Sequence, residues 1–391
     1  MFTIISADDH LVEPPDVFAG RLPAALADRA PYVRTTSKGN EIWVFDGRAH
    51  PQVGLNAVVG RDRSGSPMDP VRFDEMRRGC WDPVARVADM DRAGIWASVN
   101  FPSAITGFCG SVYSACSEPE LGLACVRAFN DWFYEEWYGA APDRFVPMGI
   151  TYLADPDAAA TEIRRNAERG FVAVSLPEQP HRLGYPSLHS GWWDPVIEAC
   201  AGTDTVICLH VGSSGMTGDL PLDGPLVELA ATLFSSLSLS ACADWLWSGY
   251  PVRYPDLKIA MSEGGIGWVP MLADRLDYII DWSGHGAGAW MSSELTASSV
   301  LRRNFWFCTL DDPSIWPIRD RIGVGHIMVE TDYPHADSTW PDCQQFLARS
   351  LAGLSPAEVA AVTHANAAAL FRHPLPAPPA PPTPPAEPEA R

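Results

Sequence analysis

The sequence is short of positively charged residues. Lys and Arg total 28 against 48 Asp and Glu, which gives a formal net charge of −20 at pH 7. Proteins that bind nucleic acids or anionic membranes do so through patches of basic side chains. We therefore expect no nucleic acid and no membrane partner. The acidic composition fits an enzyme that acts on a small-molecule substrate.

Long apolar runs are also absent. No run approaches the roughly 20 residues that a membrane-spanning helix needs. The first ten residues, MFTIISADDH, have neither the basic region nor the long apolar stretch of a signal peptide. The nine cysteines are scattered and none forms a C-x-x-C pair, which is typical of buried free thiols. We expect a cytoplasmic protein in a reducing compartment.

Nucleotide-binding fingerprints are missing too, since the chain contains neither a G-x-G-x-x-G motif nor a P-loop. What it does contain is eight short apolar runs typical of strands: 2–6, 97–101, 145–153, 171–176, 205–211, 257–263, 304–310 and 325–332. Between them lie stretches with helical spacing: 82–95, 120–141, 155–170, 192–202, 225–247, 268–282 and 313–323. This alternation predicts an α/β fold, a closed (β/α)8 TIM barrel over residues 1–372. A doubly wound open sheet is the alternative.

Two regions depart from the alternation. An N-terminal insertion is expected over about residues 20–80. Within it, NEIWVFDGRAHPQVG predicts a β-hairpin that turns near Asp46 and Gly47. A closing helix is expected over 355–371. Residues 373–391 are rich in proline and alanine, so we expect a disordered or polyproline tail. Such a tail could bind an SH3-like partner, but we favour a solvated segment.

Polar residues that can bind metal follow several of the expected strands. They are Asp8 and His10 after the first strand, His210 after the fifth, Glu263 after the sixth, and Asp332 and His335 after the eighth. In a barrel the carboxyl ends of all strands meet at one mouth. Asp8 and His10 lie on the same strand face because side chains alternate, whereas Asp9 should point away and bond to the backbone. Imidazole and carboxylate together suit Zn²⁺, Mn²⁺ or Fe²⁺.

Each of these residues also has a structural explanation. A histidine after an apolar strand, such as His210, is often simply hydrogen-bonded, and Asp332 could form a turn. Asp8 could cap a loop, or could join His10 and Asp332 in a metal-free hydrogen-bond network. Their joint position at strand ends favours a metal site with a position left open for water or substrate.

Four segments together resemble the amidohydrolase-related family, in the branch that includes aminocarboxymuconate semialdehyde decarboxylase and γ-resorcylate decarboxylase. They are SADDHLVEPPDVF, CLHVGSSG, KIAMSEGGIGWVPMLADRLD and GHIMVETDYPHADSTWP. The resemblance covers roughly residues 1–372 and implies a (β/α)8 barrel with one divalent metal, Zn²⁺ or alternatively Mn²⁺. It implies that the ligands are Asp8, His10, His210 and Asp332. It also leads us to expect a homodimer or larger homo-oligomer, for which the apolar segment 225–247 could supply an interface.

The chain departs from this family at strand six, where relatives carry an acid/base His and this sequence has Glu263. We expect hydrolysis of a small cyclic or aromatic carboxylate-type compound by metal-activated water, with Asp332 accepting the water proton and Glu263 protonating the leaving group. Glu263 could instead be a ligand. The alternative reaction is decarboxylation of an aromatic or enoic acid, with Asp332 as proton donor and Glu263 or His335 assisting. A hydratase and a non-catalytic metal-binding barrel are lesser alternatives. His335 could orient Asp332, contact substrate or cap the loop.

Overall fold

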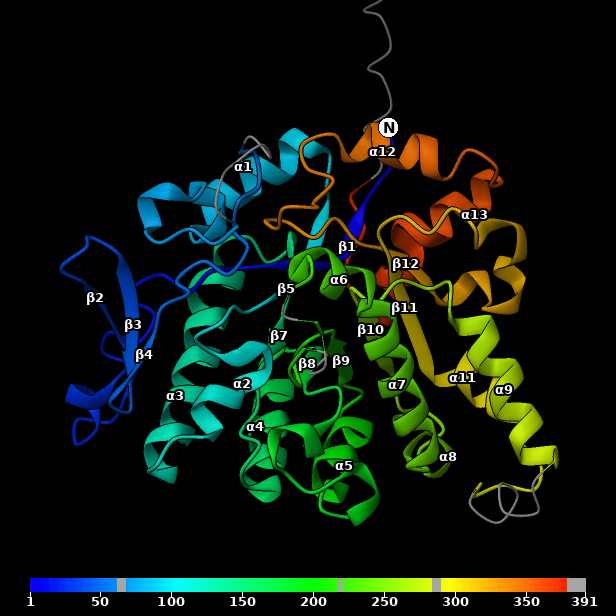
Figure 1. The fold of residues 1–391 in the computed structure, drawn as a ribbon, viewed down its shortest axis with the longest axis horizontal. Helices are drawn as coiled ribbons and strands as arrows, with labels where there is room; N and C mark the ends of the chain where they lie inside the picture. Colours follow the sequence, from blue (N-terminus) through cyan, green and yellow to red (C-terminus); the bar gives the residue numbers. More distant parts are fainter. Residues whose placement is uncertain (62–67, 217–219, 222, 283–289, 378–391) are drawn as a thin grey trace, which may run out of the picture.

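The computed structural model describes residues 1–61, 68–216, 220–221, 223–282 and 290–377. Within them, nine short parallel strands form the centre of the molecule (Figure 1). They are β1 (Ile5–His10), β5 (Ala97–Phe101), β6 (Phe145–Val146), β7 (Met148–Gly149), β8 (Ala173–Leu176), β9 (Val206–His210), β10 (Ile259–Ser262), β11 (Phe305–Thr309) and β12 (Ile327–Val329). Neighbours pair in the orders β1-β5-β6 and β7-β8-β9-β10-β11-β12.

Backbone hydrogen bonds close these strands into a ring. The Asp332 N–H donates to Asp8 O at 3.0 Å, and the His10 N–H donates to Tyr333 O at 2.6 Å. Strand β1 and the segment that follows β12 therefore form the seam. The predicted TIM barrel is confirmed and the open sheet is not.

The third expected strand, 145–153, differs from the prediction. It is divided into β6 and β7 on either side of Pro147, and it ends at Gly149. Proline has no backbone N–H to donate to a neighbouring strand, so the ladder is interrupted there. Because β6 pairs with β5 and β7 pairs with β8, the two pieces together occupy one strand position of the barrel.

Helices lie outside the ring of strands (Figure 1). The expected ones include α1 (Pro83–Ala93), α3 (Pro119–Trp132), α4 (Pro156–Arg169), α5 (Asp194–Gly202) and α9 (Val269–Trp282). Local sequence sets their ends. For example, the Asp155 carboxylate accepts the N–H groups of Asp157 and Ala158 at the start of α4, and Gly170 ends that helix with a φ of 104°. The chain also forms α2 (Gly107–Ser114), α8 (Tyr250–Arg253), α11 (Ala297–Asn304) and α12 (Cys343–Ser350), which we did not predict.

Four of the expected helices are different in the structure. The 120–141 stretch consists of α3, which ends at Trp132, and a π-helical segment, Phe133–Tyr138. Residues 313–323 contain only a 3-10 segment, Trp316–Arg321, in which Ile318 has a non-helical φ of −125° and ψ of 19°. The 225–247 stretch is divided into α6 (Leu226–Thr232) and α7 (Phe234–Trp247). The closing helix consists of α13 (Pro356–Ala360) and α14 (Asn366–Leu370), separated by a π-helical segment, Ala361–Ala365.

The N-terminal insertion forms a separate antiparallel sheet of β2 (Tyr32–Thr35), β3 (Glu41–Phe45) and β4 (Arg48–His50), at the left of Figure 1. Strands β3 and β4 are joined by Asp46 and Gly47, whose φ angles are 48° and 72°. Two successive positive φ angles define the tight turn that matches strand twist. The predicted hairpin is confirmed.

The amino end of the barrel is covered by the C-terminal segment. Leu370 and Phe371 join the apolar cluster inside the barrel, and the Trp96 indole N–H donates to Pro374 O at 2.9 Å. Trp96 directly precedes β5, so this contact lies at the end of the barrel opposite the predicted site. Most of the predicted disordered tail, 378–391, lies outside the described residues.

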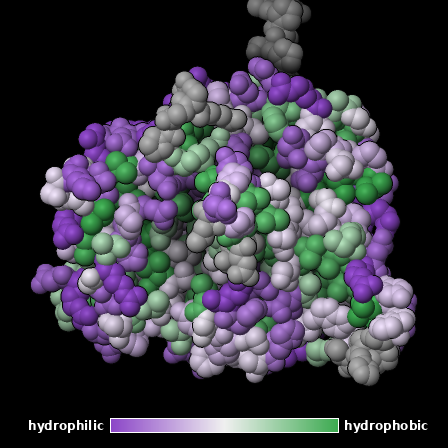
Figure 2. Space-filling model, viewed as in Figure 1, coloured by the Kyte–Doolittle hydropathy of each residue, from purple (hydrophilic) through white to green (hydrophobic). Residues whose placement is uncertain are grey.

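All nine cysteines are free thiols, as predicted. Across the described part of the chain, no single helix is long and apolar enough to cross a membrane; α6 and α7 would be so together, but they are bent by 41°. On the face in Figure 2, hydrophobic residues are interspersed with hydrophilic ones. Exposed apolar side chains include Val227 and Trp282. The predicted homo-oligomer stays a prediction.

Candidate metal centre

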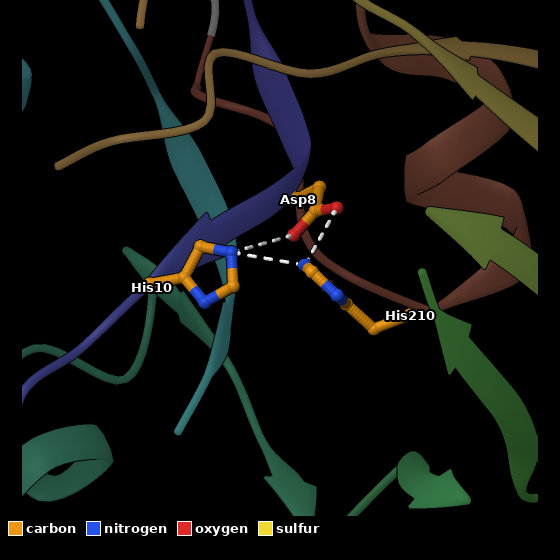
Figure 3. A group of neighbouring side chains, drawn as sticks. All are labelled: Asp8, His10 and His210. Carbon is orange, nitrogen blue, oxygen red and sulfur yellow. Dashed lines mark hydrogen bonds and ion pairs between the residues drawn. The ribbon is translucent and has the colours of Figure 1, made fainter. Parts of the chain in front are cut away.

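The four residues predicted to bind metal lie together at the carboxyl ends of the strands. Asp8 and His10 come from β1, His210 ends β9, and Asp332 follows β12; each is at most 2 % exposed. His10 Nε2 lies 3.0 Å from His210 Nε2, 3.8 Å from Asp8 Oδ1 and 3.5 Å from Asp332 Oδ1. Figure 3 shows the side chains of Asp8, His10 and His210 pointing toward one point. The donor atoms that lie within 4.8 Å of one another form two groups that share His10: Asp8, His10 and His210 in one, and His10, Asp332 and His335 in the other. Metal binding by them stays a prediction.

The neighbouring carboxylates of Asp8 and Asp9 have opposite surroundings. Asp9 Oδ1 accepts hydrogen bonds from Ser6 Oγ at 2.9 Å, Thr331 Oγ1 at 2.7 Å and Tyr333 N at 3.1 Å. Both oxygens of Asp8, which is fully buried, have no hydrogen-bond partner among the described residues. A buried carboxylate without a partner is costly, whereas a bound cation would satisfy it. Asp9 therefore bonds to the backbone at Tyr333, as predicted, and also to two hydroxyls, whereas the surroundings of Asp8 fit a metal ligand.

Hydrogen bonding fixes the state of His210. Its Nδ1 lies 2.7 Å from Val211 O, so Nδ1 carries the proton and donates it to this carbonyl. Burial lowers the pKa of His210 to about 3, so the ring is neutral and Nε2 presents a lone pair. That Nε2 faces Asp8 Oδ2 at 3.6 Å. A neutral imidazole whose other nitrogen donates to a carbonyl is the usual form of a metal-binding histidine.

Asp332 and His335 form a second part of the cluster. His335 Nδ1 lies 2.8 Å from Asp332 Oδ1, and the His335 ring packs on the His10 ring at a centroid distance of 4.0 Å. Asp332 has a φ of 51°, an uncommon conformation for a residue other than glycine. Neither Asp332 Oδ1 nor His335 Nδ1 has a partner with hydrogen-bond geometry among the described residues, so the role of His335 in orienting Asp332 stays a prediction.

Glu263 lies at the same mouth, on the turn after β10. Its Oε2 is 3.1 Å from His210 Nε2 and its Oε1 is 4.0 Å from His335 Nδ1. The Glu263 side chain is 14 % exposed, so it borders the opening. All six residues singled out from the sequence are therefore close together in the structure.

Burial dominates the titration of this cluster. It raises the pKa values of Asp8, Glu263 and Asp332 well above their usual range, and neighbouring carboxylates raise them further. It lowers the pKa of His10 well below its ordinary value and that of His335 to about 4. A divalent cation in their midst would favour the carboxylate forms and lower the carboxyl pKa values.

The sequence analysis missed three residues that shape the site. The Phe108 ring, on α2, stacks on His210 with centroids 4.9 Å apart and an interplanar angle of 23°. The Glu13 carboxylate accepts the Ser103 N–H at the start of the loop that carries Phe108. Glu330 Oε2 accepts the backbone N–H of Glu263 at 3.2 Å. Of these three residues, only Phe108 could have been noticed in the sequence, as an aromatic residue in the segment after the second strand.

A closed parallel barrel with carboxylates and histidines at the carboxyl ends of its strands defines a class of metal-dependent hydrolases and lyases. Within that class, the chain belongs to the amidohydrolase family, whose sequence profile matches residues 44–373. It is an enzyme of the amidohydrolase superfamily, and the resemblance noted from the sequence is confirmed.

One relative is similar in sequence, and two solved structures are similar in fold. The chain is 21 % identical over 271 residues to 2-amino-3-carboxymuconate-6-semialdehyde decarboxylase of Dictyostelium discoideum, covering 67 % of this chain and 69 % of the relative. The crystal structure of an amidohydrolase from Mycobacterium avium subsp. paratuberculosis K-10 superposes with a TM-score of 0.73 at 22 % identity, over 95 % of this chain and 98 % of that one. A dihydroxybenzoic acid decarboxylase from Polaromonas sp. JS666, with bound manganese and the inhibitor 2-nitroresorcinol, gives a TM-score of 0.62 at 18 % identity, over 95 % and 97 %.

Proposed function

We propose that the protein is a metal-dependent decarboxylase of an aromatic or enoic carboxylic acid, with Asp332 as the proton donor. This replaces hydrolysis as the favoured reaction, because two of the relatives described above are decarboxylases by name. The likeness to these decarboxylases carries the proposal, and the site is compatible with it, because His335 Nδ1 lies 2.8 Å from a buried Asp332 oxygen at the mouth. Decarboxylation needs such a group to deliver a proton to carbon.

The proposed metal ligands are Asp8, His10, His210 and Asp332. The orphaned oxygens of Asp8 and the lone pair on His210 Nε2 support a divalent cation at this position. When bound, such an ion would supply positive charge that offsets the negative charge of the substrate carboxylate and a neighbouring hydroxyl. Mn²⁺ or Zn²⁺ would suit this donor set, and one relative holds manganese.

The proton transfer can be written from this chain's own side chains. Asp332 gives its proton to the carbon that bears the substrate carboxylate. The bond from that carbon to the carboxylate then breaks, CO₂ leaves, and the bonding electron pair returns to the ring or enoic system. His335 returns a proton from solvent to Asp332 through its Nδ1. Phe108, whose ring is partly exposed beside His210, offers an apolar surface for a planar substrate.

Hydrolysis is the competing function, because the same residues could manage it. Asp332 would accept the proton of a water molecule, and Glu263 would protonate the leaving group. The two reactions differ in what becomes of the proton. Decarboxylation leaves a solvent-derived hydrogen on carbon, whereas hydrolysis does not.

The test therefore uses dihydroxybenzoic acids, of the kind named for the Polaromonas enzyme, as trial acids beside a panel of amides and lactones. We expect CO₂ release by the Mn²⁺- or Zn²⁺-supplied full chain, with one deuterium on the vacated carbon when the reaction runs in D₂O. Asp332→Asn should lower the rate by at least about 100-fold. The matched control is Asp274→Asn. Asp274 is an exposed residue on α9 that forms an ion pair with Arg321, and its replacement should leave the rate unchanged. Turnover of amides or lactones without CO₂ release would overturn the proposal.

A further inference from the structure

We infer that Glu263 is a fifth ligand of the metal centre and that its carboxylate shifts the preference of the centre toward Mn²⁺ or Fe²⁺. The inference rests on the proposed metal site but not on the reaction performed there. It gives a function to the residue that departs most clearly from the family pattern.

The first argument is that lone pairs face one another. His210 Nε2 carries no proton because Nδ1 donates to Val211 O. Glu263 Oε2 nevertheless lies 3.1 Å from this Nε2, closer than the 3.6 Å of Asp8 Oδ2. Two acceptor atoms repel at such a distance unless a cation or a proton lies between them. A cation between Glu263 Oε2 and His210 Nε2 would remove this conflict, and Asp8 Oδ2, 3.6 Å from the same Nε2, could bind the same ion.

The second argument is spacing. Donor atoms about 2.1 Å from one ion lie about 3 Å apart at adjacent octahedral positions and about 3.4 Å apart at tetrahedral ones. Glu263 Oε2 and His10 Nε2 lie 3.1 Å and 3.0 Å from His210 Nε2. Glu263 thus stands at a ligand-to-ligand distance from an atom whose role as a ligand we propose on other grounds.

The backbone explains why this carboxylate reaches the centre. Ser262 is in register with His210 in the β9–β10 pair, so the next residue, Glu263, enters the mouth beside that histidine. Glu263 adopts a φ of 60°, a strained conformation for a side chain with a Cβ. Its N–H is held by the buried Glu330 carboxylate at 3.2 Å. Such strain is maintained when surrounding contacts fix the residue for a particular task.

The chemistry of the donor set gives the metal preference. With Glu263, the centre has two imidazole nitrogens, from His10 and His210, and three carboxylates, from Asp8, Glu263 and Asp332. Carboxylate-rich sets of higher coordination number suit Mn²⁺ and Fe²⁺, whereas Zn²⁺ accepts four ligands readily. Loss of Glu263 should therefore weaken Mn²⁺ binding more than Zn²⁺ binding.

The experiment titrates the metal-stripped full chain with Mn²⁺ at pH 8 and follows the paramagnetic resonance signal of the free ion. Glu263→Gln removes the ligand, and Glu263→Asp keeps the charge but shortens the reach by one methylene. Glu178→Gln is the control. Glu178 is another buried carboxylate at this mouth, with a pKa raised by burial to about 7, and its Oε2 accepts the Gly212 N–H at 3.1 Å.

We expect both Glu263 variants to weaken Mn²⁺ binding at least about 10-fold, and Glu178→Gln to change it less than about threefold. With Co²⁺ in place of Mn²⁺, Glu263→Gln should intensify the visible absorption, because the coordination number falls. An unchanged Co²⁺ spectrum, or equal weakening by Glu263→Gln and Glu178→Gln, would overturn the inference. Failure of the wild type to bind Mn²⁺, Zn²⁺ or Co²⁺ would overturn the metal centre itself, which is a distinguishable result.

Discussion

Replacing Glu13 with alanine should destabilise the protein and loosen the wall of its site. Glu13 is fully buried, and its carboxylate accepts the Ser103 N–H at 2.9 Å and the Ser103 hydroxyl at 2.5 Å. The carbonyl of Ser103 in turn accepts the Phe108 N–H at 3.4 Å. Glu13 thus connects the segment that carries Asp8 and His10 to the loop that presents Phe108.

The cost follows from the two donors left behind. A buried donor without an acceptor costs about 1–3 kcal/mol. The Ser103 hydroxyl can rotate toward another acceptor, but its backbone N–H cannot. We therefore expect Glu13→Ala to lower the free energy of unfolding by roughly 2–4 kcal/mol when the Glu13 carboxyl of the wild type is neutral.

The penalty should depend on pH, because burial raises the pKa of Glu13 from 4.5 to about 7. A carboxyl whose pKa is higher in the folded state binds more protons there, so its contribution to stability is fully present below about pH 4.5. That contribution is lost as the pH rises through 7, by roughly 3 kcal/mol in total. Glu13→Ala should consequently cost far more at pH 5 than at pH 8.

Urea unfolding of the metal-stripped chain at pH 5 and pH 8 measures this difference without any contribution from metal binding. Glu13→Gln is the matched variant, since its amide oxygen still accepts the Ser103 N–H and it never ionises. It should resemble the wild type at pH 5 and exceed it in stability at pH 8. A Glu13→Gln protein that is less stable than the wild type at pH 8 would refute the argument that burial of this charge is costly.

The remaining predictions concern glycine, a helix start and metal. Gly110 has a φ of 91°, and a Cβ there would lie 2.3 Å from Thr151 O. Gly110→Ala should therefore lower the free energy of unfolding in urea by at least about 2 kcal/mol. Gly353→Ala, where a Cβ would meet no atom within 4 Å, is the control and should change it by less than about 0.5 kcal/mol. Ser355→Ala removes the capping box of α13 and should cost about 1 kcal/mol; Ser355→Thr should retain most of it. Mn²⁺ at about 100 times its dissociation constant should stabilise the wild type by about 2.7 kcal/mol and His210→Ala by nothing, as a shift in unfolding midpoint would show.

Residues at strand ends could be predicted from the sequence because one rule places them. Parallel strands of a barrel end at a common mouth, so Asp8, His10, His210 and Asp332 had to meet once the strands were recognised. Side-chain alternation likewise separated Asp8 from Asp9. Pro147 indicated that the third strand is divided, but the apolar residues on both sides of it suggested one continuous strand.

The rest depends on contacts between distant segments, which spacing does not reveal. Phe108 reaches His210 because α2 folds back over the mouth, and Glu330 reaches Glu263 past the intervening strand β11. The sequence could not distinguish hydrolysis from decarboxylation either, since Asp332 transfers a proton in both reactions. Similarity to decarboxylases, rather than any single residue, changed that choice.

The seam of the barrel and the proposed metal centre use the same residues. The Asp332 N–H and the Asp8 carbonyl form one closing hydrogen bond, while the side chains of both residues turn inward toward His10. Without a cation, burial and neighbouring carboxylates raise the pKa values of Asp8 and Asp332, so ionising both side chains beside the seam is unfavourable. A divalent ion between them would offset that cost at the one junction where the first and last strands meet. Metal binding at the proposed centre would therefore be coupled to closure of the barrel, and loss of a proposed ligand should weaken the seam as well as metal binding.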